Sequence, residues 1–298
     1  MAIVARPASG ITFTTVDNPL AAHGTQITGI SGNNLVGTYF DSIDGYSGFL
    51  YDGSTFTSIN HPLAYNDHDS GTYVTGISGN TILGTYHNLT GGYGDYGFTY
   101  DGSTFSPVGN PAPEILAYGI DGNRIVGYYA GGPGFLFNGT TFTQIIDPFA
   151  QDGTFPHGVS GNTVVGYYLT VNTSHGFLYN GSTFTNLDDP LATASFGGTR
   201  AMGISGNNVV GYYFDNTRTA HGFFYNGSTF TTIDDPLAAT GQSKGTFAQG
   251  ISGNKIVGYY VASDGYDHGF VATIPEPSTF VLAALGGLAL LVIRRRHK

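Results

Sequence analysis

Short apolar runs alternate with glycine-containing polar turns along almost the whole chain, a pattern typical of β-strands joined by tight turns. The pattern repeats, and each copy contains Gly-Ile-Ser-Gly-Asn or a close variant. The apolar residue of this segment is Ile30, Ile77, Ile120, Val159, Ile204 and Ile251 in the six copies, which are 39 to 47 residues apart. A period of this length is typical of propellers and other stacked repeats.

Each copy carries four strand signals. In the fifth copy the strands are predicted at residues 201–205, 208–213, 222–225 and 229–233. Asp-Gly or Asn-Gly pairs lie between the third and fourth strands of five copies, beginning at Asp52, Asp101, Asn138, Asn180 and Asn226. Because both residue types tolerate positive φ, type I′ hairpin turns are predicted there.

Four antiparallel strands per copy are the unit of a β-propeller blade, and one such unit cannot bury both of its faces alone. The sequence therefore predicts an all-β fold, a six-bladed β-propeller over residues 11–272. The last copy contains only three strands. Residues 11–16, Ile-Thr-Phe-Thr-Thr-Val, match the missing fourth strand and are predicted to pair with residues 269–272 and close the ring.

In such a meander the short turns lie on one face of the ring and the long, variable loops on the other. Loops on a rigid scaffold often carry binding residues, so the long-loop face is the predicted working face. Its candidate ligand-binding residues are Asp41, Asp44, Tyr46, Tyr65, Tyr93, Asp95, Tyr96, Asp215, Asp264 and Asp267. Tyrosines would stack on sugar rings and carboxylates would accept hydrogen bonds.

Charge and cysteine content narrow the possible partners. The chain has 20 acidic and 10 basic residues, and four of the basic ones occupy the last five positions. A body of this sign repels phosphate backbones, so nucleic acid is not an expected partner. Cysteine is absent, which excludes disulfides and thiolate chemistry. No metal ligand set is predicted; Ca²⁺ bound by the acidic loops is a minor alternative.

The C-terminal end has three features in order: Pro275-Glu276-Pro277, an apolar run at 280–293, and the basic residues Arg294, Arg295 and Arg296. The run predicts a hydrophobic helix that is short for a permanent span, and the basic end favours the cytoplasmic side. Residues 273–298 closely resemble a PEP-CTERM sorting domain. The resemblance implies export by a Gram-negative bacterium, transient anchoring in the inner membrane, processing by an exosortase-like enzyme near Pro275, Glu276 and Pro277, and a mature form at the cell surface or outside the cell. An ordinary single-pass anchor is the alternative.

The repeats resemble the extracellular repeats sometimes called HAF-type, through His-Gly-Phe at His175, His221 and His268. Three copies differ at this position and have Ser47, Tyr96 and Pro133 instead. This resemblance implies a surface β-repeat protein with no settled activity.

The first ten residues contain no signal peptide, because no basic segment followed by an apolar stretch is present. Our hypothesis is that residues 1–5 are the remnant of a signal sequence whose start lies further upstream.

No catalytic residues are predicted. The three histidines occupy equivalent positions in different blades, so they are expected to pack structurally. The Gly-Tyr-Tyr tyrosines recur in nearly every copy and are expected in the core. The Asp-Pro pairs at Asp147, Asp189 and Asp235 are predicted turn initiators. The Tyr-Asp-Gly-Ser-Thr-Phe hairpin resembles the Asp box of sialidase-like propellers, but its Asp directly precedes Gly.

Three functions follow from this pattern. The first is a non-catalytic surface or matrix protein that is associated with exopolysaccharide. The second is a secreted hydrolase of such polymers, which would require two loop carboxylates about 5 to 10 Å apart. The third is a structural spacer without a ligand.

Overall fold

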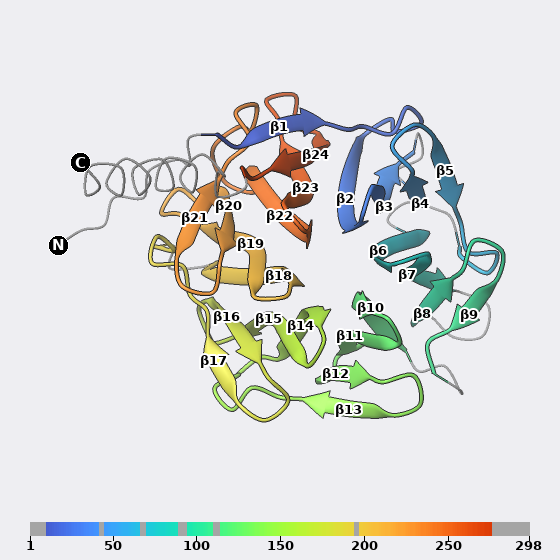
Figure 1. The fold of residues 1–298 in the computed structure, drawn as a ribbon, viewed down its shortest axis with the longest axis horizontal. Helices are drawn as coiled ribbons and strands as arrows, with labels where there is room; N and C mark the ends of the chain where they lie inside the picture. Colours follow the sequence, from blue (N-terminus) through green and yellow to red (C-terminus); the bar gives the residue numbers. More distant parts are fainter. Residues whose placement is uncertain are drawn as a thin grey trace, which may run out of the picture.

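The computed structural model describes residues 10–41, 45–65, 70–88, 94–109, 114–193 and 197–275. Within these residues the chain forms 24 β-strands. They are arranged as six four-stranded antiparallel blades around a central axis (Figure 1). Blades five, six and one are also linked by single parallel pairs, Ala220 with Gly245 and Gly24 with Asp267. The predicted all-β architecture is thus present in the described residues.

The two strands nearest the axis in each blade contain the most regular part of the repeat. The inner strands are β2 (Gly24–Ser31), β6 (Thr72–Ser78), β10 (Ile115–Asp121), β14 (Thr154–Ser160), β18 (Thr199–Ser205) and β22 (Gly245–Ser252). The second strands are β3 (Asn34–Phe40), β7 (Thr81–Asn88), β11 (Arg124–Tyr129), β15 (Thr163–Leu169), β19 (Asn208–Phe214) and β23 (Lys255–Val261). Their apolar residues alternate between the two faces of each blade.

The outer half of each blade completes its core. The third strands are β4 (Tyr46–Tyr51), β8 (Gly94–Tyr100), β12 (Gly134–Phe137), β16 (Ser174–Tyr179), β20 (Ala220–Tyr225) and β24 (Asp267–Thr273). Each contributes one fully buried phenylalanine: Phe49, Phe98, Phe135, Phe177, Phe223 and Phe270. The outer strands are β5 (Phe56–Ile59), β9 (Phe105–Pro107), β13 (Phe142–Ile145), β17 (Phe184–Asn186), β21 (Phe230–Ile233) and β1 (Thr12–Thr15).

The N-terminal strand closes the ring, as predicted. Strand β1 pairs antiparallel with β24, with Thr12 opposite Thr273 and Thr15 opposite Phe270. The side chain of Phe13 packs on the ring of Phe270, at 5.6 Å between centroids. The last blade is therefore assembled from both ends of the repeat region (Figure 1).

The Asp-Gly and Asn-Gly hairpins differ from the prediction. A type I′ turn requires positive φ at both central residues, yet here only the glycine has it, as at Gly53 with φ 97°. The reason is local hydrogen bonding: Asp52 Oδ1 accepts from the backbone N–H of Ser54 and Thr55 and from the Ser54 hydroxyl, each at 2.8 Å. This arrangement makes a four-residue loop in place of a two-residue turn.

Every inner strand contains one register shift, immediately before the glycine of Gly-Ile-Ser-Gly-Asn. The shifts lie at Ile27/Gly29, Val74/Gly76, Ala117/Gly119, Pro156/Gly158, Ala201/Gly203 and Ala248/Gly250. The glycines face the inner strand of the next blade at close range. A Cβ atom at Gly119 would lie 2.4 Å from the carbonyl oxygen of His157. Glycine at this position therefore lets adjacent inner strands approach each other around the axis.

The predicted C-terminal helix and most of the sorting motif lie outside the described residues, which end at Pro275. Within the described part of the chain, no helix has the length and apolar character needed to cross a membrane.

The inner-strand glycines approach the next blade at different distances, so replacing them with alanine should lower the stability of the protein by different amounts. We expect Gly119→Ala to lower the free energy of unfolding by about 1–3 kcal/mol, because its methyl group would overlap backbone atoms. Gly250→Ala is the matched control, since the nearest backbone atom to its methyl group would lie at 3.3 Å. It should cost less than about 1 kcal/mol, because alanine also restricts the unfolded chain. Urea unfolding measures both, and equal costs would contradict this account.

Candidate functional site

The register shift in each inner strand leaves one residue unpaired, and this residue lies at the wall of the central channel. The six residues are Thr28, Thr75, Tyr118, His157, Met202 and Gln249. A bulge of this kind commonly redirects a side chain toward a site. The repeat therefore presents one side chain per blade to the axis.

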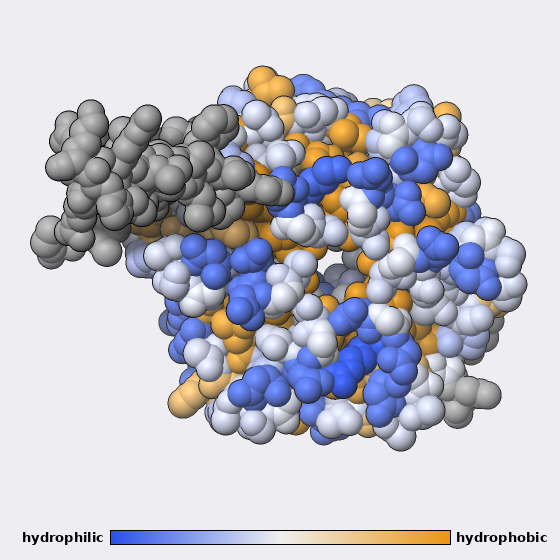
Figure 2. Space-filling model, in the orientation of Figure 1, coloured by the Kyte–Doolittle hydropathy of each residue, from blue (hydrophilic) through white to orange (hydrophobic). Residues whose placement is uncertain are grey.

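The channel contains a cavity of about 310 Å³. Its described lining includes Gln26, Tyr73, the six unpaired residues, and the isoleucine or valine that precedes the Ser-Gly-Asn or Asp-Gly-Asn turn in each copy. Figure 2 shows the opening at the centre of the ring. None of the described lining residues is an aspartate, glutamate, lysine or arginine. Burial lowers the pKa of His157 to about 3, so this histidine is also uncharged at neutral pH.

A second cavity of about 350 Å³ lies between the second and third blades, and we call it the side pocket. Its described lining is Tyr73, Thr75, Thr85, His87, Asp95, Leu116 and Tyr118. Tyr73, Thr75 and Tyr118 also line the central cavity, so the two cavities are neighbours. The side pocket occurs beside Gly84-Thr85-Tyr86 in the second copy. Four other copies have Gly-Tyr-Tyr there, so the smaller Thr85 stands where those copies have a tyrosine.

The side pocket combines stacking surfaces with hydrogen-bonding groups. His87 Nδ1 lies 3.1 Å from Asp95 Oδ1, and both side chains are about one-third exposed. The Tyr118 hydroxyl forms a hydrogen bond with the Tyr128 hydroxyl at 3.1 Å, and burial raises the pKa of Tyr118. The ring of Tyr73 packs against Tyr46, with centroids 4.3 Å apart. Two tyrosines with fixed positions and an adjacent histidine–aspartate pair suit the binding of a polyhydroxylated ligand.

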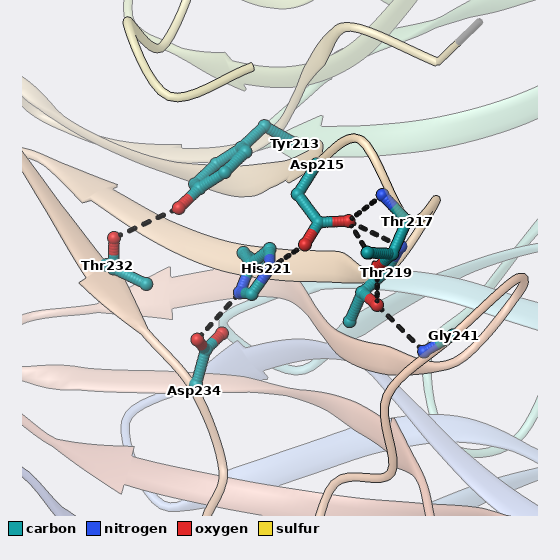
Figure 3. A network of polar contacts seen from close by, with 8 residues as sticks. All are labelled: Tyr213, Asp215, Thr217, Thr219, His221, Thr232, Asp234 and Gly241. Carbon is teal, nitrogen blue, oxygen red and sulfur yellow. Dashed lines mark hydrogen bonds and ion pairs between the residues drawn. The ribbon is translucent and has the colours of Figure 1, made fainter. Parts of the chain in front are cut away.

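The three histidines of His-Gly-Phe are held by carboxylates in separate blades. Figure 3 shows the fifth-blade group, in which His221 lies between two aspartates. Its Nδ1 is 2.8 Å from Asp234 Oδ2, and its Nε2 is 3.4 Å from Asp215 Oδ2. Asp215 Oδ1 also accepts hydrogen bonds from the backbone N–H groups of Thr217 and Thr219. The group therefore ties the third strand to its loop and to the outer strand.

Equivalent contacts occur at the other two histidines. His175 Nδ1 lies 2.9 Å from Asp188, and His268 lies 2.8 Å from Asp17 and 3.1 Å from Asp264. The partners Asp188, Asp234 and Asp17 occur only in the copies that have the histidine; the other three copies have Asn60, Gly109 and Ile146 there. This internal covariation agrees with the predicted structural role. We call the three groups histidine clamps.

The predicted loop residues do not form one cluster. Asp95 lines the side pocket, and Tyr46 packs behind its wall. The Asp267 carboxylate accepts a hydrogen bond of 2.6 Å from Gln26 Nε2, at the edge of the central cavity. Asp215 and Asp264 belong to histidine clamps.

The remaining predicted residues lie elsewhere. Asp41 accepts a hydrogen bond from the Gly45 backbone N–H and so closes its own loop. Tyr65 is 44% exposed, and Tyr96 packs on Tyr86. Asp44 and Tyr93 lie outside the described residues.

Two other sequence expectations have clear outcomes. The Asp-Pro turns are confirmed, because Asp147, Asp189 and Asp235 each accept a hydrogen bond from the backbone N–H two residues later. The expectation that all Gly-Tyr-Tyr tyrosines are core was wrong in part. Tyr168, Tyr213 and Tyr260, which are second tyrosines, are buried, and so is the first tyrosine Tyr212 at the wall of the central cavity. Tyr259, another first tyrosine, lines the same cavity and is only partly buried.

Sequence reasoning missed Tyr73, Thr75, His87, Tyr118 and His157 because it searched the loops. One signal was present. The residue before the glycine of Gly-Ile-Ser-Gly-Asn differs among copies (Thr, Thr, Tyr, His, Met and Gln), although the segment after it is nearly constant. Among the described residues, no three histidine, aspartate or glutamate side chains gather in a way that would hold a metal ion.

The fold and the tail agree with known proteins in two different ways. The chain is a propeller protein of six β repeats, and residues 273–296 match the family model of the PEP-CTERM protein-sorting motif. The protein therefore carries the sorting signal of an exported protein that is processed by an exosortase. The comparison with curated protein sequences finds no match.

Several solved structures are similar in fold. The six-bladed fucose-binding lectin of the fungus Aleuria aurantia is 15% identical, with a TM-score of 0.52 over 87% of this chain and 93% of the lectin chain. The sialidase of Trypanosoma rangeli, in complex with the inhibitor DANA, is 15% identical with a TM-score of 0.49, over 91% of this chain and 60% of its own. At these identities, the likeness to the lectin establishes the propeller fold alone.

The clamp at His221 predicts a pH-dependent contribution to stability. Hydrogen bonding to Asp234 raises the pKa of His221, so its stabilisation is complete below the ordinary histidine pKa and is lost as the pH rises through the raised value. We expect His221→Gln to cost about 1 kcal/mol at pH 6 and less at pH 9.

His61→Gln provides a control, because the opposite dependence of stability on pH is expected for His61. Burial lowers the pKa of His61 to about 4, so the stabilisation by this residue is present above the ordinary histidine pKa and decreases as the pH falls toward 4. Thermal unfolding of both variants and the unmodified chain from pH 5.5 to 9 measures the two trends. A cost of His221→Gln that does not depend on pH would refute the charged clamp.

Proposed function

We propose that this protein is an exported, non-catalytic surface or matrix protein that binds extracellular polysaccharide through the side pocket. The single observation that carries the proposal is the side pocket itself, with Tyr73 and Tyr118 as stacking surfaces and His87 and Asp95 as hydrogen-bonding groups. Aromatic side chains next to a few fixed polar groups are the usual composition of a sugar-binding site. The sorting motif supplies the extracellular setting.

The described residues favour binding over hydrolysis. Glycoside hydrolysis generally uses two carboxylates about 5 to 10 Å apart. Among the described residues that line the two cavities, Asp95 is the one carboxylate, and it is paired with His87. The similar solved structures include a lectin and a sialidase, so the fold itself is compatible with either function.

The tail supports a specific route to the surface. On this proposal, the apolar run at 280–293 holds the chain briefly in the inner membrane, Arg294, Arg295 and Arg296 remain cytoplasmic, and an exosortase-like enzyme cleaves near Pro275, Glu276 and Pro277. Strand β24 ends at Thr273, so the motif directly follows the closed ring. Cleavage there would release the propeller without removing any of its described strands.

Filling the side pocket tests the binding function. We expect Thr85→Tyr, which introduces the residue found in four of the other five copies, to weaken polysaccharide binding at least tenfold, because the new ring would occupy the pocket. Thr143→Tyr on the exposed surface of β13 is the matched control and should bind normally. Glycan arrays and calorimetry on the full chain in detergent, with and without Ca²⁺, measure this. Unchanged binding by Thr85→Tyr would exclude the pocket, and no binding by any form would favour the spacer.

The sorting route is tested separately. We expect deletion of residues 275–298, which leaves β24 complete, to abolish processing and surface retention when the chain is expressed behind an export signal in an exosortase-carrying bacterium. Mass spectrometry of the mature C-terminus and cell fractionation measure this, and an exosortase-deletion strain is the control. An intact C-terminus on the surface-located wild-type chain would contradict the proposal.

A further inference from the structure

The residue that leads into the sorting motif is fixed at one face of the ring. The backbone N–H of Ile274 donates a hydrogen bond of 2.9 Å to the carbonyl oxygen of Asn254, which lies in the Ser-Gly-Asn turn between β22 and β23. We call the face formed by these turns and by the Asp-Gly and Asn-Gly hairpins the turn face. The tail therefore leaves the propeller at the turn face, opposite the long-loop face.

The turn face is a connected polar surface. Neighbouring turns are joined by hydrogen bonds from a glycine N–H to the side chain that begins the preceding turn. These bonds run from Gly79, Gly122, Gly161 and Gly206 to Ser31, Ser78, Asp121 and Ser160, respectively. Among the described residues, the exposed large apolar side chains all lie on or beside the long-loop face instead: Leu20, Leu63, Tyr65, Ile146, Phe149, Val171, Leu237 and Tyr266.

Charge is divided just as unequally between the two faces. The described acidic residues at the turn face are Asp52, Asp101 and Asp121, and Arg124 and Lys255 lie among them. The described acidic residues at the long-loop ends of the strands are Asp17, Asp41, Asp95, Glu114, Asp147, Asp152, Asp188, Asp189, Asp215, Asp234, Asp235, Asp264 and Asp267, with Arg200, Arg218 and Lys244 as the basic ones. A surface of anionic lipid therefore repels the long-loop face far more than the turn face.

The short link between the ring and the apolar run limits how the chain can lie on a membrane. Residues 276–279 are all that separate Pro275 from the run at 280–293. A fully extended link of this length spans at most about 18 Å. Strand β24, with 7 residues, is itself about 20 Å long, and the tail leaves from its turn-face end. The link is therefore too short to let the long-loop face rest on the bilayer that holds the run.

We propose that, while the apolar run is in the inner membrane, the turn face is directed at the lipid headgroups and the long-loop face points away from the membrane. This inference rests on the proposed function and deepens it. His87 and Asp95 lie at the long-loop ends of β7 and β8, so the side pocket is on the side that polysaccharide can reach before the chain is cleaved. The Pro-Glu-Pro motif lies between the propeller and the bilayer.

Single cysteines can report this orientation, because the chain has none of its own. Asn162 and Val171 are exposed and lie just beyond the turn-face and long-loop ends of β15. Asn162→Cys and Val171→Cys, each with the same fluorescent donor, are placed as full chains in nanodiscs of phosphatidylethanolamine and phosphatidylglycerol that carry an acceptor on the headgroups. We expect energy transfer to be at least twofold more efficient from position 162 than from position 171.

A second pair in the fifth blade guards against an effect of one substitution on folding. Asn207 and Asn216 are exposed and lie just beyond the two ends of β19. Asn207→Cys and Asn216→Cys should repeat the result, with the stronger transfer from position 207. Co-elution of the unlabelled full chain with the nanodiscs in size-exclusion chromatography measures anchoring itself.

The outcomes separate this inference from the proposed function. Equal transfer from the two ends of each strand, or stronger transfer from positions 171 and 216, would overturn the orientation and leave both the sorting route and polysaccharide binding in place. A full chain that does not co-elute with nanodiscs would overturn the orientation together with the proposed membrane anchoring. Polysaccharide binding through the side pocket is decided independently by Thr85→Tyr.

Discussion

The whole ring depends on the close approach of six inner strands, and glycine makes that approach possible. A Cβ atom would lie 2.4 Å from a neighbouring carbonyl oxygen at Gly119 and 2.7 Å at Gly203. At Gly29 it would lie 3.1 Å from the Cα of Gly76. Each of these glycines faces the inner strand of the next blade, so the same steric constraint applies at every contact between neighbouring inner strands. It accounts for the invariance of this glycine in all six copies.

The same constraint creates the candidate site. Each inner strand has an irregular register next to its glycine, and the residue that is left unpaired lines the channel. The side chain at this position differs among copies: the threonines donate hydrogen bonds to backbone carbonyls of the next blade, whereas the rings of Tyr118 and His157 pack on each other. The repeat thus holds the backbone constant and leaves the channel-lining positions open to specialisation, which is where Tyr118 and His157 occur.

The sequence predicted the blades well because their signals are local. The strands were predicted from their periodicity, from the turn residues, and from the match of residues 11–16 to the missing strand. The structure confirms these strands with bounds that differ by at most two residues. The hairpin turn type could not be predicted from Asn-Gly or Asp-Gly alone, because the side chain of Asp52 competes for the same backbone groups. The side pocket was missed for another reason. Its existence depends on the contact of two blades at Thr85 and Tyr118, which are 33 positions apart in the chain and lie on different strands.

The departures from the repeat divide the ring into two parts with different properties. Blades four, five and six carry the histidine clamps, and the clamp at His268 contacts Asp17, so it also fastens the N-terminal strand at the seam. A closing strand at a chain end has only non-covalent contacts to hold it, and the aspartate at its end bonds both the histidine ring and the Gly269 backbone N–H.

The second blade lacks the clamp. It has Tyr96 in place of the clamp histidine, and its Asp95 pairs with His87 inside the side pocket. The histidine–aspartate pair therefore fastens the seam on one side of the ring and lies in the wall of the side pocket on the other. In a protein built from near-identical copies, such differences between copies indicate function better than the features that all copies share.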